Sequence, residues 1–114
     1  METYIVKVPV SGNIEVVPFD EGNSYGQIKD AVGGYIEIAP IPTIPTKEPY
    51  GIDCFVDEEG LLKNLPFNER LMAFARPVYD RPLVGDAVFV AYDAEGETVG
   101  LTKADADAIV ERLA

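Results

Sequence analysis

A chain of 114 residues has room for one domain, because typical domains hold roughly 100 to 150 residues. Its 47% hydrophobic residues allow a chain of this size to bury roughly two thirds of its unfolded surface, which argues against intrinsic disorder. The net charge of -11 argues against binding to nucleic-acid phosphates or to an anionic membrane, and the absence of histidine excludes imidazole as a base or metal ligand.

The beginning of the chain predicts a β-hairpin followed by a helix. Residues 3–10 and 14–18 are rich in β-branched and aromatic side chains, and the Ser-Gly-Asn between them has turn chemistry. Asn23 or Ser24 can cap a helix that ends before the glycine pair at 33–34. One face of this helix carries the apolar side chains of Tyr25, Ile28 and Val32.

The middle of the chain predicts two strands separated by a stiff loop. The strands are expected at 35–38 and 50–56. Between them, four prolines make residues 39–49 a proline-rich loop, because proline has no amide hydrogen for a strand ladder. A turn follows at 57–60, in which Gly60 can take a positive φ. After this turn we expect two side chains to return toward the core, those of Leu61 and Leu62.

A short helix and a central strand are predicted next. Asn68 is expected to cap a helix over 69–75, and Pro77 ends this helix because residues before proline avoid the α region. The run 86–92 is almost continuously apolar, which is typical of a strand covered on both faces.

The end of the chain predicts a turn, a brief return strand and a helix. The turn is expected at 93–96 and the strand at 97–100, and Thr102 with Asp105 resembles a capping box with aspartate in place of glutamate. The helix has a core-facing stripe of Ala106, Ile109, Val110 and Leu113. Because strands and helices alternate irregularly, we expect one α+β domain over 1–114, with a mostly antiparallel mixed sheet and two or three short helices packed on one side of it.

Two common ligand-binding motifs fail on inspection. Residues 22–29 place glycines near a helix start, but they lack the glycine spacing and the following Lys-Ser/Thr of a phosphate-binding loop. The acids after residue 92 fit the first positions of a calcium loop, yet Thr98 and Ala104 stand where glycine and a carboxylate are required. We therefore expect neither a metal nor a cofactor.

Acidic residues and one cysteine form a second group of candidates. Asp57, Glu58 and Glu59 are the densest acid cluster, expected either to be solvated in a turn or to bind a divalent cation weakly. Asp53 must face water or find a buried donor, and strand alternation favours water. The single cysteine, Cys54, has no base nearby and is expected in the core. One cysteine and an N-terminus without a signal-peptide pattern indicate a cytoplasmic protein.

The basic residues have one focus. Four of the nine, with two asparagines, lie close together in the sequence at Lys63, Asn64, Asn68, Arg70, Arg76 and Arg81. Arginine suits bidentate contacts, so this stretch is a candidate site for an anionic ligand or for an acidic patch on a partner. The alternative is that these side chains neutralise nearby acids such as Glu69 and Asp80. Asn68 likewise has two alternative roles, as a helix cap or as an amide presented to a partner.

Three stretches together resemble a known family. Residues 33–37, 57–68 and 84–90, in this order and spacing, resemble the uncharacterised domain-of-unknown-function family 3846, small proteins carried by phages, plasmids and other mobile elements. The resemblance implies an accessory protein in a bacterial cytoplasm and carries no catalytic residues. The family usually has arginine directly after the asparagine, whereas here Glu69 separates Asn68 from Arg70, which puts a family role for Arg70 in doubt.

Three functions follow as hypotheses. The leading one is a non-enzymatic accessory protein that binds a host or phage protein, with no direct nucleic-acid or membrane contact and with a homodimer left open. The first alternative is an acidic DNA mimic that inhibits a nucleic-acid-binding or defence protein. The second is a small-molecule binder or enzyme that uses Asp53 and Arg70, for which a shared pocket would be the supporting observation.

Overall fold

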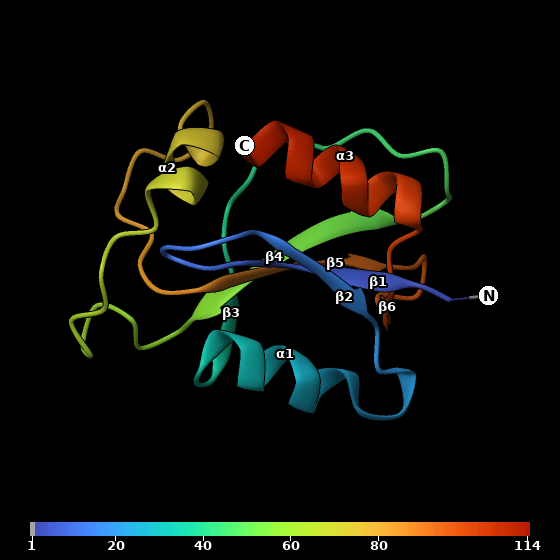
Figure 1. Cartoon of the computed structure of the whole chain (residues 1–114), viewed down its shortest axis with the longest axis horizontal. Coiled ribbons are helices and arrows are strands. Elements are labelled where there is room, and N and C mark those ends of the chain that lie inside the picture. The colour runs from blue at the N-terminus through green and yellow to red at the C-terminus, as the bar shows by residue number, and fades with distance from the viewer. Residues whose placement is uncertain (1) are drawn as a thin grey trace.

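Six strands form one antiparallel sheet in the structure, a computed structural model that describes residues 2–114 (Figure 1). The strands are β1 (Tyr4–Val8), β2 (Glu15–Pro18), β3 (Ile36–Ile38), β4 (Gly51–Asp57), β5 (Ala87–Tyr92) and β6 (Thr98–Val99). Their order is β2-β1-β5-β4-β3, and β6 pairs with β5 off this path. The central position of β5 explains its continuous apolar run, while β2 and β3 are the edge strands.

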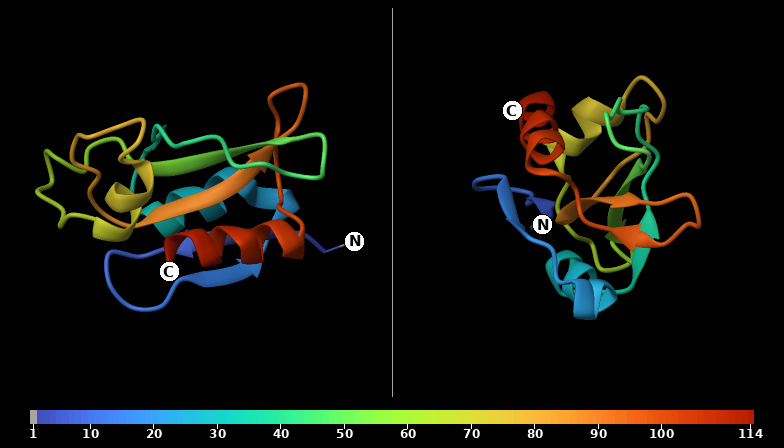
Figure 2. Two further views of the ribbon diagram at one scale, coloured as in Figure 1. Left: turned by 90° about the horizontal axis from the view of Figure 1, so that it is seen from above. Right: turned by 90° about the vertical axis from the view of Figure 1, so that its right-hand side faces the viewer.

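Helices cover both faces of this sheet. A short 3-10 helix, η1 (Glu21–Asn23), leads into α1, and the α-helices are α1 (Ser24–Val32), α2 (Glu69–Ala75) and α3 (Lys103–Leu113). Figures 1 and 2 show α1 on one side of the sheet and α2 with α3 on the other. The α+β class is confirmed, but the expectation of helices on one side of the sheet is wrong, because the sheet has an apolar side chain set on each face and α1 covers the second one.

Two apolar cores result from these layers. Successive residues of a strand point to opposite faces. In β5, Val88 and Val90 accordingly pack in the smaller core with Ile28 of α1, whereas Phe89 packs in the larger core with Leu71 of α2 and Ile109 of α3. The predicted stripe of α3 is confirmed, since Ala106, Ile109 and Leu113 are buried and Val110 is half-buried against the same core.

The predicted elements are found with small shifts at their ends. The hairpin pairs Tyr4 with Pro18 through Lys7 with Glu15, and α2 has the expected bounds. Gly33 ends α1 in a left-handed conformation at φ 91, which favours glycine. Asn23 stands at the N-cap of α1 but makes no side-chain hydrogen bond there.

Two local expectations are wrong. Tyr25 does not join the buried face of α1, since its side chain is 55% exposed and its hydroxyl thus keeps access to water. Gly60 does not adopt positive φ, and Asn64 takes the left-handed conformation of this segment at φ 57. Gly60 is needed for space instead, because a Cβ there would lie 2.6 Å from a methyl carbon of Val84.

Candidate functional site

The loop between β4 and α2, residues 58–65, is an ordered segment that we call the leucine loop. Its backbone folds on itself through bonds from the Lys63 amide to the Glu59 carbonyl at 2.9 Å and from the Leu65 amide to the Gly60 carbonyl at 3.0 Å. The Asn64 amide also donates to the Leu61 carbonyl at 3.1 Å. The loop is therefore held in one shape by its own hydrogen bonds.

The side chain of Asp57 accepts hydrogen bonds from the leucine loop and holds it in place. Its carboxylate is buried, with Lys63 Nζ donating to Oδ2 at 2.7 Å and the Glu59 amide donating to Oδ1 at 2.8 Å. Burial raises the pKa of the Asp57 carboxyl, but these hydrogen bonds and the Lys63 charge outweigh it, so the pKa lies below its ordinary value. The expected solvated acid turn is thus wrong for Asp57, whereas Glu58 and Glu59 are exposed.

Two leucines at the tip of the leucine loop point into solvent. Leu61 is 67% exposed and Leu62 is 86% exposed, so the expectation that they return to the core is wrong. The reason is that the loop closes its turns locally, and Gly60 and Leu65 are the residues that contact the segment around Val84 and Gly85. The leucine loop therefore presents an adjacent apolar pair preceded by two exposed acids.

Asn68 is a buried structural residue. Its side-chain oxygen accepts from the Leu71 amide at 3.2 Å, which confirms the predicted cap of α2. Its amide nitrogen donates to the carbonyls of Val8 and Gly85, each at 3.0 Å. Because the side chain is 0% exposed, it has no surface to present to a partner, and the alternative role proposed for Asn68 is excluded.

The remaining basic side chains are held by different parts of the fold. Lys63 is engaged by Asp57, while the Arg70 guanidinium donates to the backbone carbonyl of Gly12 in the β1–β2 loop. Arg76 and Arg81 are exposed. Neither Glu69 nor Asp80 forms an ion pair with them within residues 2–114. The basic stretch of the sequence is therefore spread over several surfaces.

Asp53 lies on a different part of the molecule from Arg70. It is half-buried and lines a cavity of about 520 Å³ under the proline-rich loop, whose lining does not include Arg70. Desolvation raises the pKa of its carboxyl. Cys54, next to it, is fully buried as predicted, and burial together with the neighbouring acid raises the pKa of its thiol. A thiol of this kind is a poor nucleophile at neutral pH.

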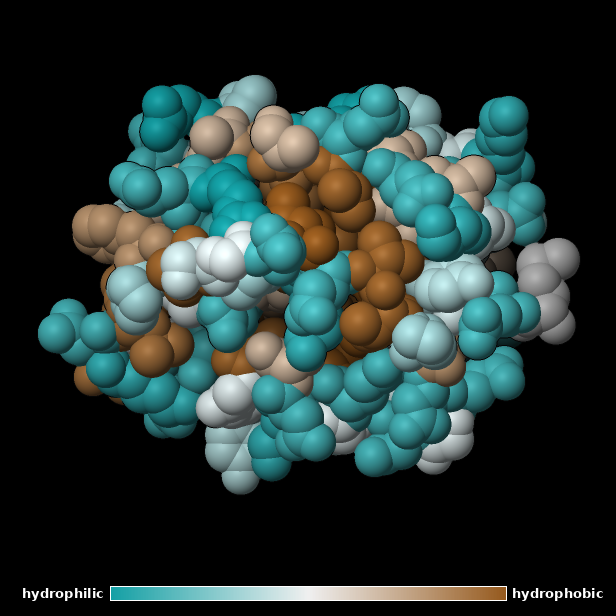
Figure 3. Space-filling view, viewed as in Figure 1, coloured by the Kyte–Doolittle hydropathy of each residue, from teal (hydrophilic) through white to brown (hydrophobic). Residues whose placement is uncertain are grey.

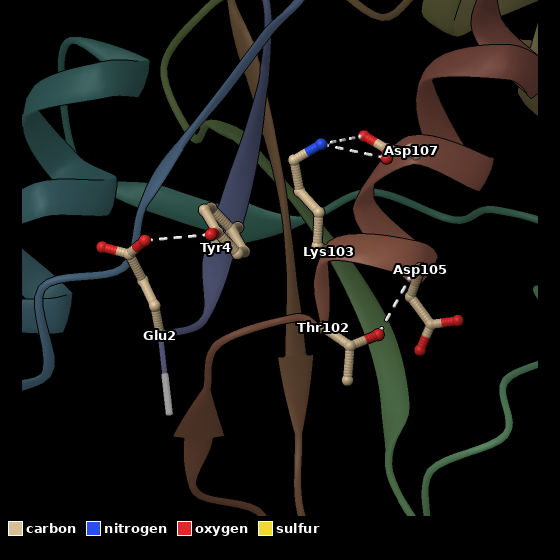
Figure 4. Close-up of polar contacts among 6 residues, drawn as sticks. All are labelled: Glu2, Tyr4, Thr102, Lys103, Asp105 and Asp107. Carbon is tan, nitrogen blue, oxygen red and sulfur yellow. Dashed lines mark hydrogen bonds and ion pairs between the residues drawn. The ribbon is translucent and has the colours of Figure 1, made fainter.

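Hydrogen bonds and an ion pair stabilise the first turn of α3. Figure 4 shows the Asp105 amide donating to Thr102 Oγ1, at 3.2 Å, and Lys103 paired with Asp107 at 3.0 Å. The other half of the predicted capping box is replaced by Tyr50, whose hydroxyl donates to the Asp105 carboxylate and accepts from the Thr102 amide at 3.1 Å. The box is therefore closed by the side chain of Tyr50, the residue that directly follows the proline-rich loop.

An apolar area also opens between α3 and the β1–β2 hairpin. Figure 3 shows it near the centre of that face, surrounded by hydrophilic side chains. The elements that border it supply half-buried Ile14, Val16 and Val110, which pack on the larger core. Because these side chains already contact the core, they protrude less than the leucine pair.

Residues 2–114 contain neither a cluster of metal ligands nor a helix suited to a bilayer. No group of three or more metal-ligating His, Cys, Asp or Glu side chains occurs within that range. No described helix has the length and apolar character needed to cross a bilayer.

The chain was compared with known proteins. A family model described as a domain of unknown function, DUF3846, matches residues 1–114. No match was found among curated proteins or among solved structures. Since the family model covers the whole length, the chain belongs to the DUF3846 family.

Proposed function

We propose that this protein is a non-enzymatic accessory protein of a phage, plasmid or related mobile element, which acts in the bacterial cytoplasm by binding a host or phage protein through the leucine loop. The observation that carries the proposal is the exposure of Leu61 and Leu62, at 67% and 86%, on a loop closed by hydrogen bonds. Their side chains contribute little to the core in this position, so a binding role accounts for their placement.

The energetics favour such a surface as a binding element. Burying a leucine side chain at an interface stabilises a complex by roughly 1.5–3 kcal/mol. The cost of ordering a loop on binding is small here, because the Asp57–Lys63 pair and the backbone bonds already hold the leucine loop in shape. An apolar pair on a preorganised loop is the arrangement expected of an interface anchor.

Charge indicates the chemistry of the partner. Glu58 and Glu59 precede the leucine pair and are exposed, and the whole chain carries a net charge of -11. A partner with an apolar pocket inside a basic rim complements this surface and is attracted to it at long range. The predicted arginine candidates, Arg76 and Arg81 among them, lie on other surfaces and remain to be tested as alternative contacts.

The acidic DNA mimic is the alternative for the same overall charge. A mimic needs carboxylates along one face and no apolar anchor, whereas here two leucines and Lys63 follow the only two acids of the loop. The two hypotheses differ in salt dependence, since contacts with a DNA-binding site would be screened steeply and apolar contacts would not.

The experiment is affinity capture from cells that carry the element, followed by mass spectrometry, with three variants beside the parent. The Leu61→Ser, Leu62→Ser double variant is expected to lose the partner. Val78→Ser is the matched control, because Val78 is 55% exposed outside the loop. The Arg70→Ala, Arg76→Ala double variant tests the predicted arginine candidates.

All variants should melt within a few degrees of the parent, since the altered side chains are not in the core. Selective loss of one protein with the leucine double variant, retained with Val78→Ser, supports the proposal. Recovery unchanged by the leucine double variant contradicts it. If only the arginine double variant loses the partner, binding is assigned to these arginines instead.

A further inference from the structure

The cavity under the proline-rich loop exists because β3 is shorter than β4 and pairs only with the C-terminal half of β4. The Ala39 amide still donates to the Cys54 carbonyl at 2.8 Å, and Pro40 then turns the chain away from the sheet. The outer edge of β4 before Cys54 is therefore left without a neighbouring strand. Residues 38–46 bridge this gap as a wall rich in proline and isoleucine beside a half-open cavity of about 520 Å³, a volume typical of small-ligand pockets.

A backbone acceptor faces this cavity. Residues of an antiparallel strand point their amide and carbonyl groups alternately to either side. Since the Cys54 carbonyl points toward β3, the groups of Ile52, two residues earlier, point the same way, where β3 has ended. Neither group of Ile52 has a backbone partner within residues 2–114. The Ile52 carbonyl is thus free to accept a hydrogen bond from a ligand.

An aromatic ring and a carboxylate share one face at this cavity. Tyr92 pairs with Gly51 and Val90 pairs with Asp53, so the side chains of Tyr92 and Asp53 are diagonal neighbours on the same side of the sheet, roughly 7–8 Å apart by strand geometry. Gly51 makes room for the ring, because a Cβ there would collide with it. Tyr92 remains 39% exposed and belongs to the lining of this cavity.

The charge of the lining selects the kind of ligand. Asp53 is the one charged side chain among the lining residues, which include no lysine or arginine. Its carboxylate has no hydrogen-bond or ion-pair partner within residues 2–114, unlike the Tyr50 hydroxyl, which also belongs to the lining and is bound to Asp105. A half-buried carboxylate with no counter-charge attracts a cation and repels an anion.

We propose that this cavity binds a small organic ammonium ion that carries an apolar body. The ammonium group pairs with the Asp53 carboxylate and donates to the Ile52 carbonyl, and the Tyr92 ring faces the positive charge. The apolar body packs against the isoleucines and prolines of residues 38–46. This site is separate from the leucine loop and goes beyond the proposed function.

The test uses three probes of similar shape and different charge with the full chain at pH 7. Phenethylammonium is the cation, 2-phenylethanol the neutral analogue and 3-phenylpropionate the anion, each titrated while amide shifts of the protein are followed by NMR. The ammonium is expected to saturate and to shift the amides of residues 51–54. The alcohol should bind at least about tenfold more weakly, because it lacks the charge-assisted bond, and the anion should not bind.

Variants place the effect at the site. Asp53→Asn keeps the size of the side chain and removes its charge, and it should weaken the ammonium about tenfold or more. Glu111→Gln is the matched control, because Glu111 is exposed on α3 outside the cavity and its loss changes the net charge equally. Equal binding of the three probes to the parent protein overturns the proposal, whether or not the variants fold. The proposal is also overturned if Glu111→Gln weakens ammonium binding as much as Asp53→Asn does, because the net charge of the protein would then explain the binding.

Discussion

Replacing Asn68 with alanine should be among the most damaging polar substitutions in this protein. The Asn68 side chain is fully buried and makes three hydrogen bonds, one as the cap of α2 and two to carbonyls in other parts of the chain. Loss of a cap alone costs about 1 kcal/mol of the free energy of unfolding. Each buried carbonyl left without a donor adds about 1 kcal/mol, so Asn68→Ala should cost about 3 kcal/mol.

Thr102→Ala is the comparison that isolates the cap. Thr102 caps α3 through one side-chain hydrogen bond, to the Asp105 amide, and its loss should cost about 1 kcal/mol. Urea unfolding of both variants followed by circular dichroism gives the two free energies. If Asn68→Ala costs no more than Thr102→Ala, then the bonds to Val8 and Gly85 add nothing, and the reasoning is refuted.

A second variant separates the cap oxygen of Asn68 from its amide. Asn68→Asp keeps an oxygen for the Leu71 amide, but it places a carboxylate oxygen against the carbonyls of Val8 and Gly85. At pH 7 it should be less stable than Asn68→Ala, because a buried charge would face two acceptors. Its pKa in the folded state would be raised, so the deficit should shrink as the pH falls and the group becomes protonated.

Two further predictions concern pH. The pKa of Asp57 is lowered in the folded state. Its contribution to the free energy of unfolding is therefore present above the ordinary carboxyl pKa and is lost as the pH falls through the lowered pKa of the folded state. Asp57→Asn should flatten the acid side of the stability profile measured by urea unfolding. Burial and the hydrogen bond to Asp105 raise the pKa of Tyr50, so its contribution is present below the ordinary tyrosine pKa and lost as the pH rises through the raised one. Tyr50→Phe should cost about 1–2 kcal/mol of the free energy of unfolding at pH 7, because two hydrogen bonds are lost. Measured by urea unfolding, this variant should also lose less stability than the parent at alkaline pH. An alkaline profile equal to that of the parent would contradict the role given to Tyr50.

Much of the secondary structure was predictable because its signals are local. The cap of α2, the glycine that ends α1 and the capping threonine of α3 each act within one helical turn. The apolar run of β5 marked it as a covered strand, since only a strand with elements on both faces can bury every side chain. The α+β class followed from these elements together with the irregular order in which they occur.

The order of the strands and the surroundings of the candidate residues were decided by the tertiary structure. Asn68 gains its second and third hydrogen bonds from residues 60 and 17 positions away, which no local pattern indicates. The closure of the leucine loop brings Lys63 back to the buried carboxylate of Asp57, and the same closure turns Leu61 outward.

Asp53 and Arg70 show the same limit at the level of a site. The sequence supplied both as candidates for one ligand, but β4 carries Asp53 to the proline-rich loop, while α2 brings Arg70 to the β1–β2 loop. Hydrophobic alternation and capping fix which way a side chain points from its own element. Which groups meet there depends on the packing of distant elements, and only the folded chain determines it.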